Sequence, residues 1–125
     1  MNKDIVSTPH APAAIGPYSQ AVRTGLVVFT SGQIGLDPAT GQLVEGFEPQ
    51  VRRAFANLDA VAQAAGGSLA SAVKFTLYLT DLAQFATVNQ IMGELLPQPY
   101  PARSTVGVAS LPRGAAFEVE AILVL

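Results

Sequence analysis

Charged side chains near the C-terminal end are the residues of this sequence best suited to chemistry. Arg103 lies in the strand-like run 101–109, and Glu118 and Glu120 lie in the strand-like run 117–125. Because side chains alternate between the two faces of a strand, the two glutamates share one face. Ions at such half-buried positions are paired or hydrated, because an unpaired buried charge costs several kcal/mol.

Two interpretations of these charges stay open. In the first, Arg103 forms a structural ion pair with Glu118 or Glu120, or the charges lie at a hydrated sheet edge. In the second, the three residues line a pocket, in which an arginine binds a carboxylate through two parallel N–H groups and a glutamate orients a water molecule for attack. The spacing of the residues does not decide between a salt bridge and a site.

Other polar residues give weaker support for a functional site. His10 is the only histidine and there is no cysteine, so a metal centre, a thiolate nucleophile or a Ser-His-Asp triad has no support. The glycines of 16–20 and 32–35 match neither a phosphate-binding loop nor a dinucleotide fingerprint. Asn89 is expected on the inward face of a helix, where its amide needs a partner. Tyr18 is equally compatible with the core and with a pocket.

Two segments carry the period of an amphipathic helix. The first is 47–65, followed by the glycine pair 66–67 as a stop signal. The second is 81–96, which starts at a potential Asp81 cap and ends before Pro97. The residues predicted to face inward are Phe47, Val51, Phe55, Leu58, Val61, Ala62 and Ala65 in the first helix and Leu82, Phe85, Val88, Met92 and Leu95 in the second.

The remaining segments are strand-like. Runs rich in β-branched and aromatic residues predict strands at 26–31, 72–80, 101–109 and 117–125. The Pro- and Gly-rich segment 10–22 reads as a loop that runs into a short strand, and 36–43 reads as a turn that closes a hairpin or leads out of one. The order is strands, helix, strand, helix and strands, which predicts an α+β fold with both helices on one face of a sheet.

The composition limits the classes of function. A chain of 125 residues is expected to form a single domain, 1–125,. Half of its residues are hydrophobic and 13% are charged, which favours self-association of the uncovered sheet face. Seven basic and nine acidic side chains without a basic cluster argue against a nucleic-acid partner. No apolar run approaches the roughly 18 residues of a membrane span, and no signal peptide is visible, so a cytoplasmic location is expected.

Four stretches carry a resemblance to a known family. They are APAAIGPYSQAV (11–22), TSGQIGLDPATGQL (30–43), AVKFTLYLTDLAQFATVNQ (72–90), and YPARSTVGVASLP with FEVEAILVL (100–112 and 117–125). On these motifs the chain resembles the RidA family of reactive intermediate enamine and imine deaminases over nearly its whole length. The resemblance implies a chorismate-mutase-like mixed β-sheet and a homotrimer with sites between subunits. It also implies hydrolysis of 2-aminoacrylate and 2-aminocrotonate to 2-keto acids and ammonia, without a cofactor or metal.

The resemblance also assigns site residues. Arg103 matches the arginine that binds the substrate carboxylate, and Gly32 matches the glycine whose N–H meets the same group. Tyr18 matches a site tyrosine, and Glu118 matches the glutamate that holds the attacking water. Pocket-wall positions fall on Ser31, Phe85 and Asn89, and Thr105 replaces the cysteine of many members.

Two other functions are also compatible with the sequence. One is a catabolic deaminase of the 2-aminomuconate type, whose dicarboxylate substrate needs a second cation such as Arg113 or Arg23. Another is a non-enzymatic regulatory trimer that binds 2-keto acids through the same Arg103. Ribonuclease activity has been attributed to relatives, but the acidic charge balance argues against it here,.

Overall fold

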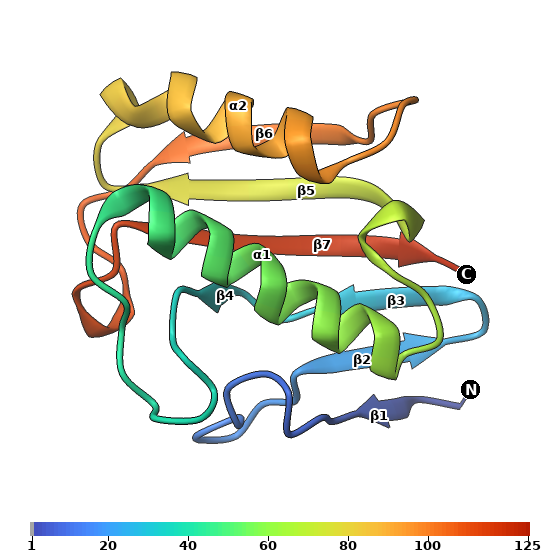
Figure 1. The fold of residues 1–125 in the computed structure, drawn as a ribbon. Coiled ribbons are helices and arrows are strands. Elements are labelled where there is room, and N and C mark those ends of the chain that lie inside the picture. Colours follow the sequence, from blue (N-terminus) through green and yellow to red (C-terminus); the bar gives the residue numbers. More distant parts are fainter. Residues whose placement is uncertain (1) are drawn as a thin grey trace.

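A twisted mixed sheet forms the frame of the molecule (Figure 1), whose computed structural model describes residues 2–125. The strand order is β1-β2-β3-β7-β5-β6, and β4 pairs with β7 outside this path. Only β5 and β6 run parallel; the other pairs are antiparallel. The strands are β1 (Asp4–Val6), β2 (Ala21–Thr24), β3 (Val27–Thr30), β4 (Gln33–Ile34), β5 (Ala72–Leu79), β6 (Ala102–Gly107) and β7 (Phe117–Val124).

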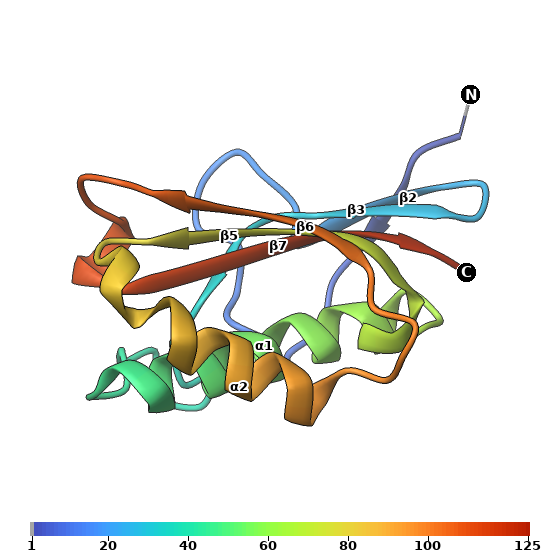
Figure 2. The ribbon, with the colours of Figure 1, turned by 90° about the horizontal axis from the view of Figure 1, so that it is seen from above.

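Both helices cover the same face of this sheet, as Figure 2 shows, and the other face carries no helix. Helix α1 (Phe47–Ala64) lies over the middle of the sheet, and α2 (Phe85–Leu95) lies beside it. Three short 3₁₀ turns complete the chain: η1 (Leu69–Ser71), η2 (Leu82–Gln84) and η3 (Pro112–Gly114). The predicted mixed sheet with two helices on one face is therefore confirmed.

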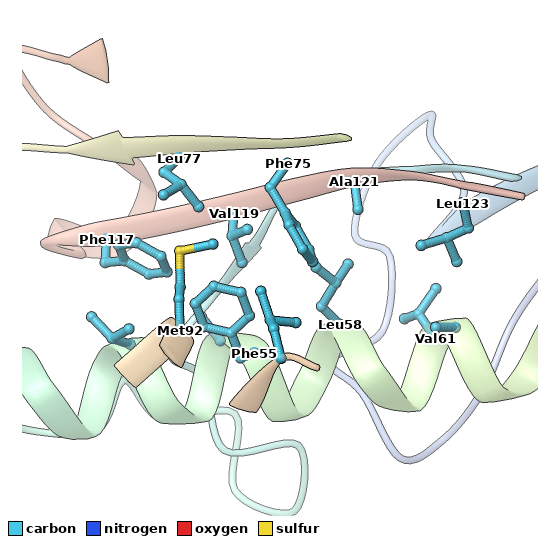
Figure 3. Close-up of a cluster of buried hydrophobic side chains, with 14 of the residues drawn as sticks. Phe55, Leu58, Val61, Phe75, Leu77, Met92, Phe117, Val119, Ala121 and Leu123 are labelled. Carbon is cyan, nitrogen blue, oxygen red and sulfur yellow. The ribbon is translucent and has the colours of Figure 1, made fainter. Parts of the chain in front are cut away.

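The core lies between the helices and β5 and β7 (Figure 3). The Phe55 ring packs against Phe75 and Phe117, with centroids 5.8 and 5.7 Å apart, and all three side chains are fully buried. Replacing such a phenylalanine by alanine costs about 3–5 kcal/mol. The two central strands are thus held rigidly from the helix side, which fixes the residues on their opposite side.

The opposite side, here called the open face, carries both polar and apolar side chains. It exposes large hydrophobic side chains that no element of the chain covers, including Phe29, Val106 and Val124, which are 49%, 41% and 45% exposed. An apolar surface of this kind on a small domain is typical of a contact with another molecule. No helix among residues 2–125 has the length and apolar character needed to cross a membrane.

The second helix differs most from its prediction. It opens with η2, capped by Asp81, whose carboxylate accepts the Ala83 N–H at 3.0 Å, and the α-helix starts only at Phe85. A 3₁₀ turn has three residues per turn, so the face extrapolated at the α-helical period is wrong at Leu82 in η2, whereas Leu95 is the last residue of α2. Leu82 and Leu95 are 52% and 40% exposed, contrary to the prediction, and Ile91 is buried instead.

The predicted strands are present but are shorter than the predicted runs. The run expected at 101–109 is ordered as a strand only over β6, and 26–31 is shortened to β3. The hairpin turn at 36–43 is confirmed by a bridge between Leu36 and Leu43. Strands β1 and β4, which have three and two residues, were not predicted because they are too short to show a period.

Candidate active site

Two hollows hold most of the predicted site residues. The first, here called the glutamate cavity, has a volume of about 360 Å³. The second, the arginine groove, has a volume of about 330 Å³. The glutamate cavity is lined by Pro12, Ala13, Ile15, Tyr18, Gln20, Gly32, Gln33, Ile34, Leu36, Pro112, Arg113 and Glu118; the arginine groove is lined by Asn89, Met92, Gly93, Leu96, Tyr100, Pro101 and Arg103.

Glu118 and Gly32 form one unit of the glutamate cavity. Strand β3 pairs with β7, residues 31–32 leave the sheet ladder, and β4 then pairs with β7 again. In this second pairing Ile34 lies opposite Glu118. The Glu118 carboxyl group lies directly against the Gly32 Cα, so that an ideal Cβ at position 32 would overlap it. Glycine is therefore required here for close approach. Burial raises the pKa of the half-buried Glu118, and the charge of Glu120 raises it further,.

Three buried amide side chains hold the cavity walls in place. Gln20 donates to the carbonyl oxygens of Thr8 and Pro12 at 3.1 and 2.8 Å, which fixes the N-terminal loop. Fully buried Asn57 donates to the Ile34 and Leu36 carbonyls at 3.2 and 2.8 Å. These bonds satisfy carbonyl groups that are partly or fully buried,, so the cavity walls are held in place by the chain itself.

A third amide completes this frame. The Gln50 side-chain oxygen accepts the N–H of Ala116 at 2.9 Å and so ties α1 to the start of β7. Sequence reasoning missed all three amides. The available signal was their placement: Gln50 and Asn57 lie seven residues apart within an apolar helical face, where an amide must find a partner.

Tyr18 and Ser31 lie close together in this region but differ in role. Tyr18 lines the cavity with a half-exposed ring, and its hydroxyl oxygen accepts the Ile15 N–H at 3.3 Å. The Ser31 hydroxyl donates to the Ser19 carbonyl at 2.6 Å, and Ser31 N–H donates to the Gln20 carbonyl. Ser31 therefore anchors the loop that carries Tyr18 and is not among the residues that line the cavity.

Arg103 lies in the arginine groove without an acidic partner among residues 2–125. Its guanidinium stacks over the Phe85 ring, 5.0 Å from the centroid, and Nη1 lies 3.5 Å from the sulfur of Met92. A cation–π contact orients the guanidinium while leaving its N–H groups available. The ion pairs of the described chain involve Arg52 alone, with Glu48 and Glu94, so Arg103 remains free to bind an external anion.

Asn89 also lines the arginine groove, but its predicted inward orientation is wrong. The residue is exposed on α2, because the neighbouring Val88, Ile91 and Met92 occupy the side of the helix that faces the sheet. Because the side chain is exposed, its amide needs no internal partner,.

The sheet separates Arg103 from both glutamates. Arg103 lies opposite the buried Phe75 in the β5–β6 register, on the helix side. Glu118 lies opposite Tyr78 in the β5–β7 register, on the open face. The predicted ion pair between Arg103 and Glu118 or Glu120 is therefore wrong, because the side chains point to opposite faces from strands separated by β5. Within one chain, Arg103 and Glu118 therefore line two separate hollows.

Thr105 lies two residues beyond Arg103 on the helix side, opposite Leu77. Its hydroxyl oxygen is enclosed and has no hydrogen-bond partner among residues 2–125. The contact of Thr105 with substrate stays a prediction. No group of three or more potential metal-ligating side chains occurs among residues 2–125.

The fold and this arrangement of residues define a family. The family model described as Endoribonuclease L-PSP matches residues 8–125, and the chain belongs to this family. A protein of Dermatophagoides farinae named 2-iminobutanoate/2-iminopropanoate deaminase is 44% identical over 124 residues, which are 98% of this chain and 97% of the relative. The expected kinship with RidA proteins is thereby confirmed.

Solved structures agree with this assignment. RidA from the Antarctic bacterium Psychrobacter sp. superposes with a TM-score of 0.96 at 49% identity, over 98% of this chain and 99% of that chain. TdcF of E. coli, solved with bound serine, superposes with a TM-score of 0.90 at 43% identity, over 98% of each chain. The fold of this chain is the RidA fold.

Proposed function

We propose that this protein hydrolyses 2-imino and 2-enamino acids, such as 2-aminocrotonate and 2-aminoacrylate, to 2-keto acids and ammonia. The observation that carries this proposal is the half-buried carboxylate of Glu118, held against Gly32 in the glutamate cavity. Full-length relatives named 2-iminobutanoate/2-iminopropanoate deaminase support the choice of reaction.

The reaction needs one water molecule and no redox partner. The enamine tautomerises to the imine, whose protonated form has an electrophilic carbon. The water oxygen adds to this carbon while Glu118 accepts a proton from the water. Glu118 returns this proton to the nitrogen of the tetrahedral intermediate and accepts the proton of its hydroxyl group as ammonia leaves, so that the C=O bond of the keto acid forms. The raised pKa of Glu118 makes this carboxylate a stronger base than an exposed glutamate.

Substrate binding requires a cation, and Arg103 is the proposed one. Its guanidinium can take a carboxylate with two parallel N–H donors, and the Phe85 ring holds it in place. Serine bound to the related TdcF is also a small molecule with a carboxylate. Because the sheet lies between Arg103 and Glu118 of one chain, Arg103 of a second copy must supply the anchor.

The proposed assembly is a closed homotrimer in which the open faces are buried. Apolar side chains on that face support association,. In a closed ring each contact is head-to-tail, so that different surfaces of neighbouring copies meet. Three equivalent sites then form, each with Arg103 from one copy and Glu118 from the next. The number three rests on the family resemblance.

A mixing experiment tests this proposal. Threonine dehydratase generates the imine, and release of the keto acid is followed with and without the protein. We expect acceleration by the wild type and none by Arg103→Ala or Glu118→Gln alone. Co-expression of the two variants in equal amounts restores roughly a quarter of the wild-type rate, because one neighbour pair in four carries both intact residues. Absence of recovery from folded mixed oligomers refutes the shared site; absence of wild-type acceleration refutes the reaction.

A dicarboxylic substrate is a second candidate, favoured by the position of Arg113. This residue lines the glutamate cavity, whereas Arg23 donates to the Gly25 and Ala65 carbonyls outside it. A second carboxylate on the substrate could pair with Arg113. Comparison of monocarboxylic and dicarboxylic imines with wild type and Arg113→Gln decides: selective loss of the dicarboxylate supports it, and equal rates exclude it.

A further inference from the structure

Glu118 has an acidic neighbour that the proposed reaction does not use. Glu120 follows two positions later on β7, so the two carboxylates share the open face,. Across the β5–β7 pair, Tyr78 lies opposite Glu118 and Thr76 lies opposite Glu120. The Tyr78 side chain reaches diagonally across the β5–β7 pair, and its hydroxyl donates a hydrogen bond to Glu120 Oε1 at 2.6 Å. A phenol–carboxylate hydrogen bond of this length is strong and directional, so Glu120 is held in a defined position beside Glu118.

This arrangement is costly for stability. Two like charges on the same face of a strand repel each other, and both glutamates are half-buried,. No ion pair among residues 2–125 involves either of them. The surrounding open face is apolar at Phe29, Val106 and Val124. Replacing Tyr78 and Glu120 together by hydrophobic residues would remove this repulsion without leaving the Tyr78 hydroxyl unpaired,, which points to a role of the pair other than folding.

Few other charges lie near this pair. On the open face of β5, Lys74 lies opposite Ile122, beyond Thr76. The residues of β3 and β6 on this face are uncharged, and Arg113 and Tyr18 line the cavity with Glu118. In the proposed assembly, Arg103 of the next copy also faces Glu118. All of these groups stay constant when only Tyr78 or Glu120 is changed.

The direction of the electrostatic effect follows from the geometry. A fixed negative charge beside Glu118 disfavours its ionised form, and burial together with Glu120 raises the pKa of Glu118,. The hydrogen bond to Glu120 is the first cause that raises the pKa of Tyr78, to about 12. Tyr78 therefore remains a proton donor throughout the range in which Glu118 titrates.

We propose that Tyr78 and Glu120 are positioning residues: Tyr78 fixes the Glu120 carboxylate, whose charge sets the pH range in which Glu118 accepts a proton. Neither residue touches the substrate in this scheme. The inference rests on the proposed function as far as catalysis is concerned. The electrostatic coupling between Glu120 and Glu118 is a property of the folded chain and can be measured without substrate.

The first test is the pH dependence of kcat/KM for wild type, Tyr78→Phe, Glu120→Gln and the double variant. Glu120→Gln moves the acid limb to lower pH by about half a pH unit, the size expected for one charge in a partly hydrated site. Tyr78→Phe, which removes the hydrogen bond that holds Glu120, moves the acid limb to lower pH by less than Glu120→Gln does. The double variant matches Glu120→Gln, because Tyr78 acts only through Glu120. KM stays unchanged in all three.

A matched control removes the same charge elsewhere. Glu45 is exposed in the loop before α1, and Glu45→Gln leaves the acid limb where it is in the wild type. Superimposed profiles for wild type and Glu120→Gln overturn the inference. So does an equal shift in Glu45→Gln, which traces the effect to net charge.

The second test does not depend on turnover. Carbon-13 NMR of the glutamate carboxyl groups follows the titration of Glu118, assigned by its loss in Glu118→Gln. We expect a lower midpoint in Glu120→Gln than in wild type. An unchanged midpoint refutes the coupling even if the protein is an active deaminase. A shifted midpoint in a protein without deaminase activity upholds the coupling and refutes the proposed function alone.

Discussion

Adding one methyl group at Gly32 should disable the glutamate cavity without unfolding the protein. In Gly32→Ala the new Cβ would lie 2.7 Å from the Glu118 carboxyl carbon and 3.1 Å from Cγ. Ordinary contact begins near 3.4 Å, so the carboxyl carbon must move by at least about 0.7 Å. Misplacement of a reacting group by 1 Å costs up to about 100-fold in rate. We therefore expect a fall in kcat of about 10- to 100-fold.

The stability of this variant should change little, because the group that yields is the end of a flexible side chain. Gly35→Ala is the matched control. Its Cβ would lie 2.7 Å from Gln50 Cα and 2.8 Å from the Gln50 carbonyl oxygen, which are backbone atoms that cannot rotate away. This overpacking should cost about 1–3 kcal/mol.

Two measurements separate the variants: keto-acid release in the dehydratase-coupled assay and the midpoint of thermal unfolding. Gly32→Ala loses turnover and keeps its melting temperature, whereas Gly35→Ala loses stability. Wild-type kcat in a folded Gly32→Ala protein would refute the reasoning, since the carboxylate would then work equally well from a displaced position.

Three further predictions concern stability and the buried polar groups. Glu118→Gln raises the melting temperature at neutral pH, because the folded-state pKa of Glu118 is raised and its ionised form therefore destabilises the folded protein. This destabilisation is complete above the folded-state pKa and vanishes below the unfolded value of about 4.5. The gain in melting temperature must therefore disappear on acidification. Asn57→Leu leaves the Ile34 and Leu36 carbonyls without their donor and lowers the free energy of unfolding by about 2–4 kcal/mol in urea denaturation, whereas Gln63→Leu on the exposed side of α1 changes it by less than about 0.5 kcal/mol. Thr105→Val removes an enclosed hydroxyl that has no partner among residues 2–125 and raises the free energy of unfolding by about 1 kcal/mol with unchanged turnover. A loss of turnover would instead support the predicted contact of Thr105 with substrate.

Periodicity identified the elements that bury a continuous face. The period of 47–65 identified the inward residues of α1, and the alternation in 117–125 separated the two glutamates from the four residues of β7 that the structure places in the core, Phe117, Val119, Ala121 and Leu123. The same alternation placed Glu118 and Glu120 together on the other face. These predictions succeeded because burial on one side of a long element constrains many residues at once.

Relations between elements were beyond such patterns. Alternation within β6 and β7 could not say that Arg103 and Glu118 point in opposite directions, because that depends on the register of both strands against β5. Asn89 was misplaced because it lies off the side of α2 that Val88, Ile91 and Met92 bury against the sheet. The link from Asn57 to the β4 segment joins residues more than twenty positions apart, and no local signal specifies it.

The placement of Arg103 and Glu118 on opposite sides of the sheet has a consequence for enzyme concentration. A chain whose site requires Arg103 of a neighbouring copy has no activity as a monomer, even when it is correctly folded. In the proposed assembly, the rate per chain therefore falls on dilution once subunits separate, by mass action. The total rate then rises more steeply than the amount of protein, so the cell gains little from making a small quantity of this enzyme.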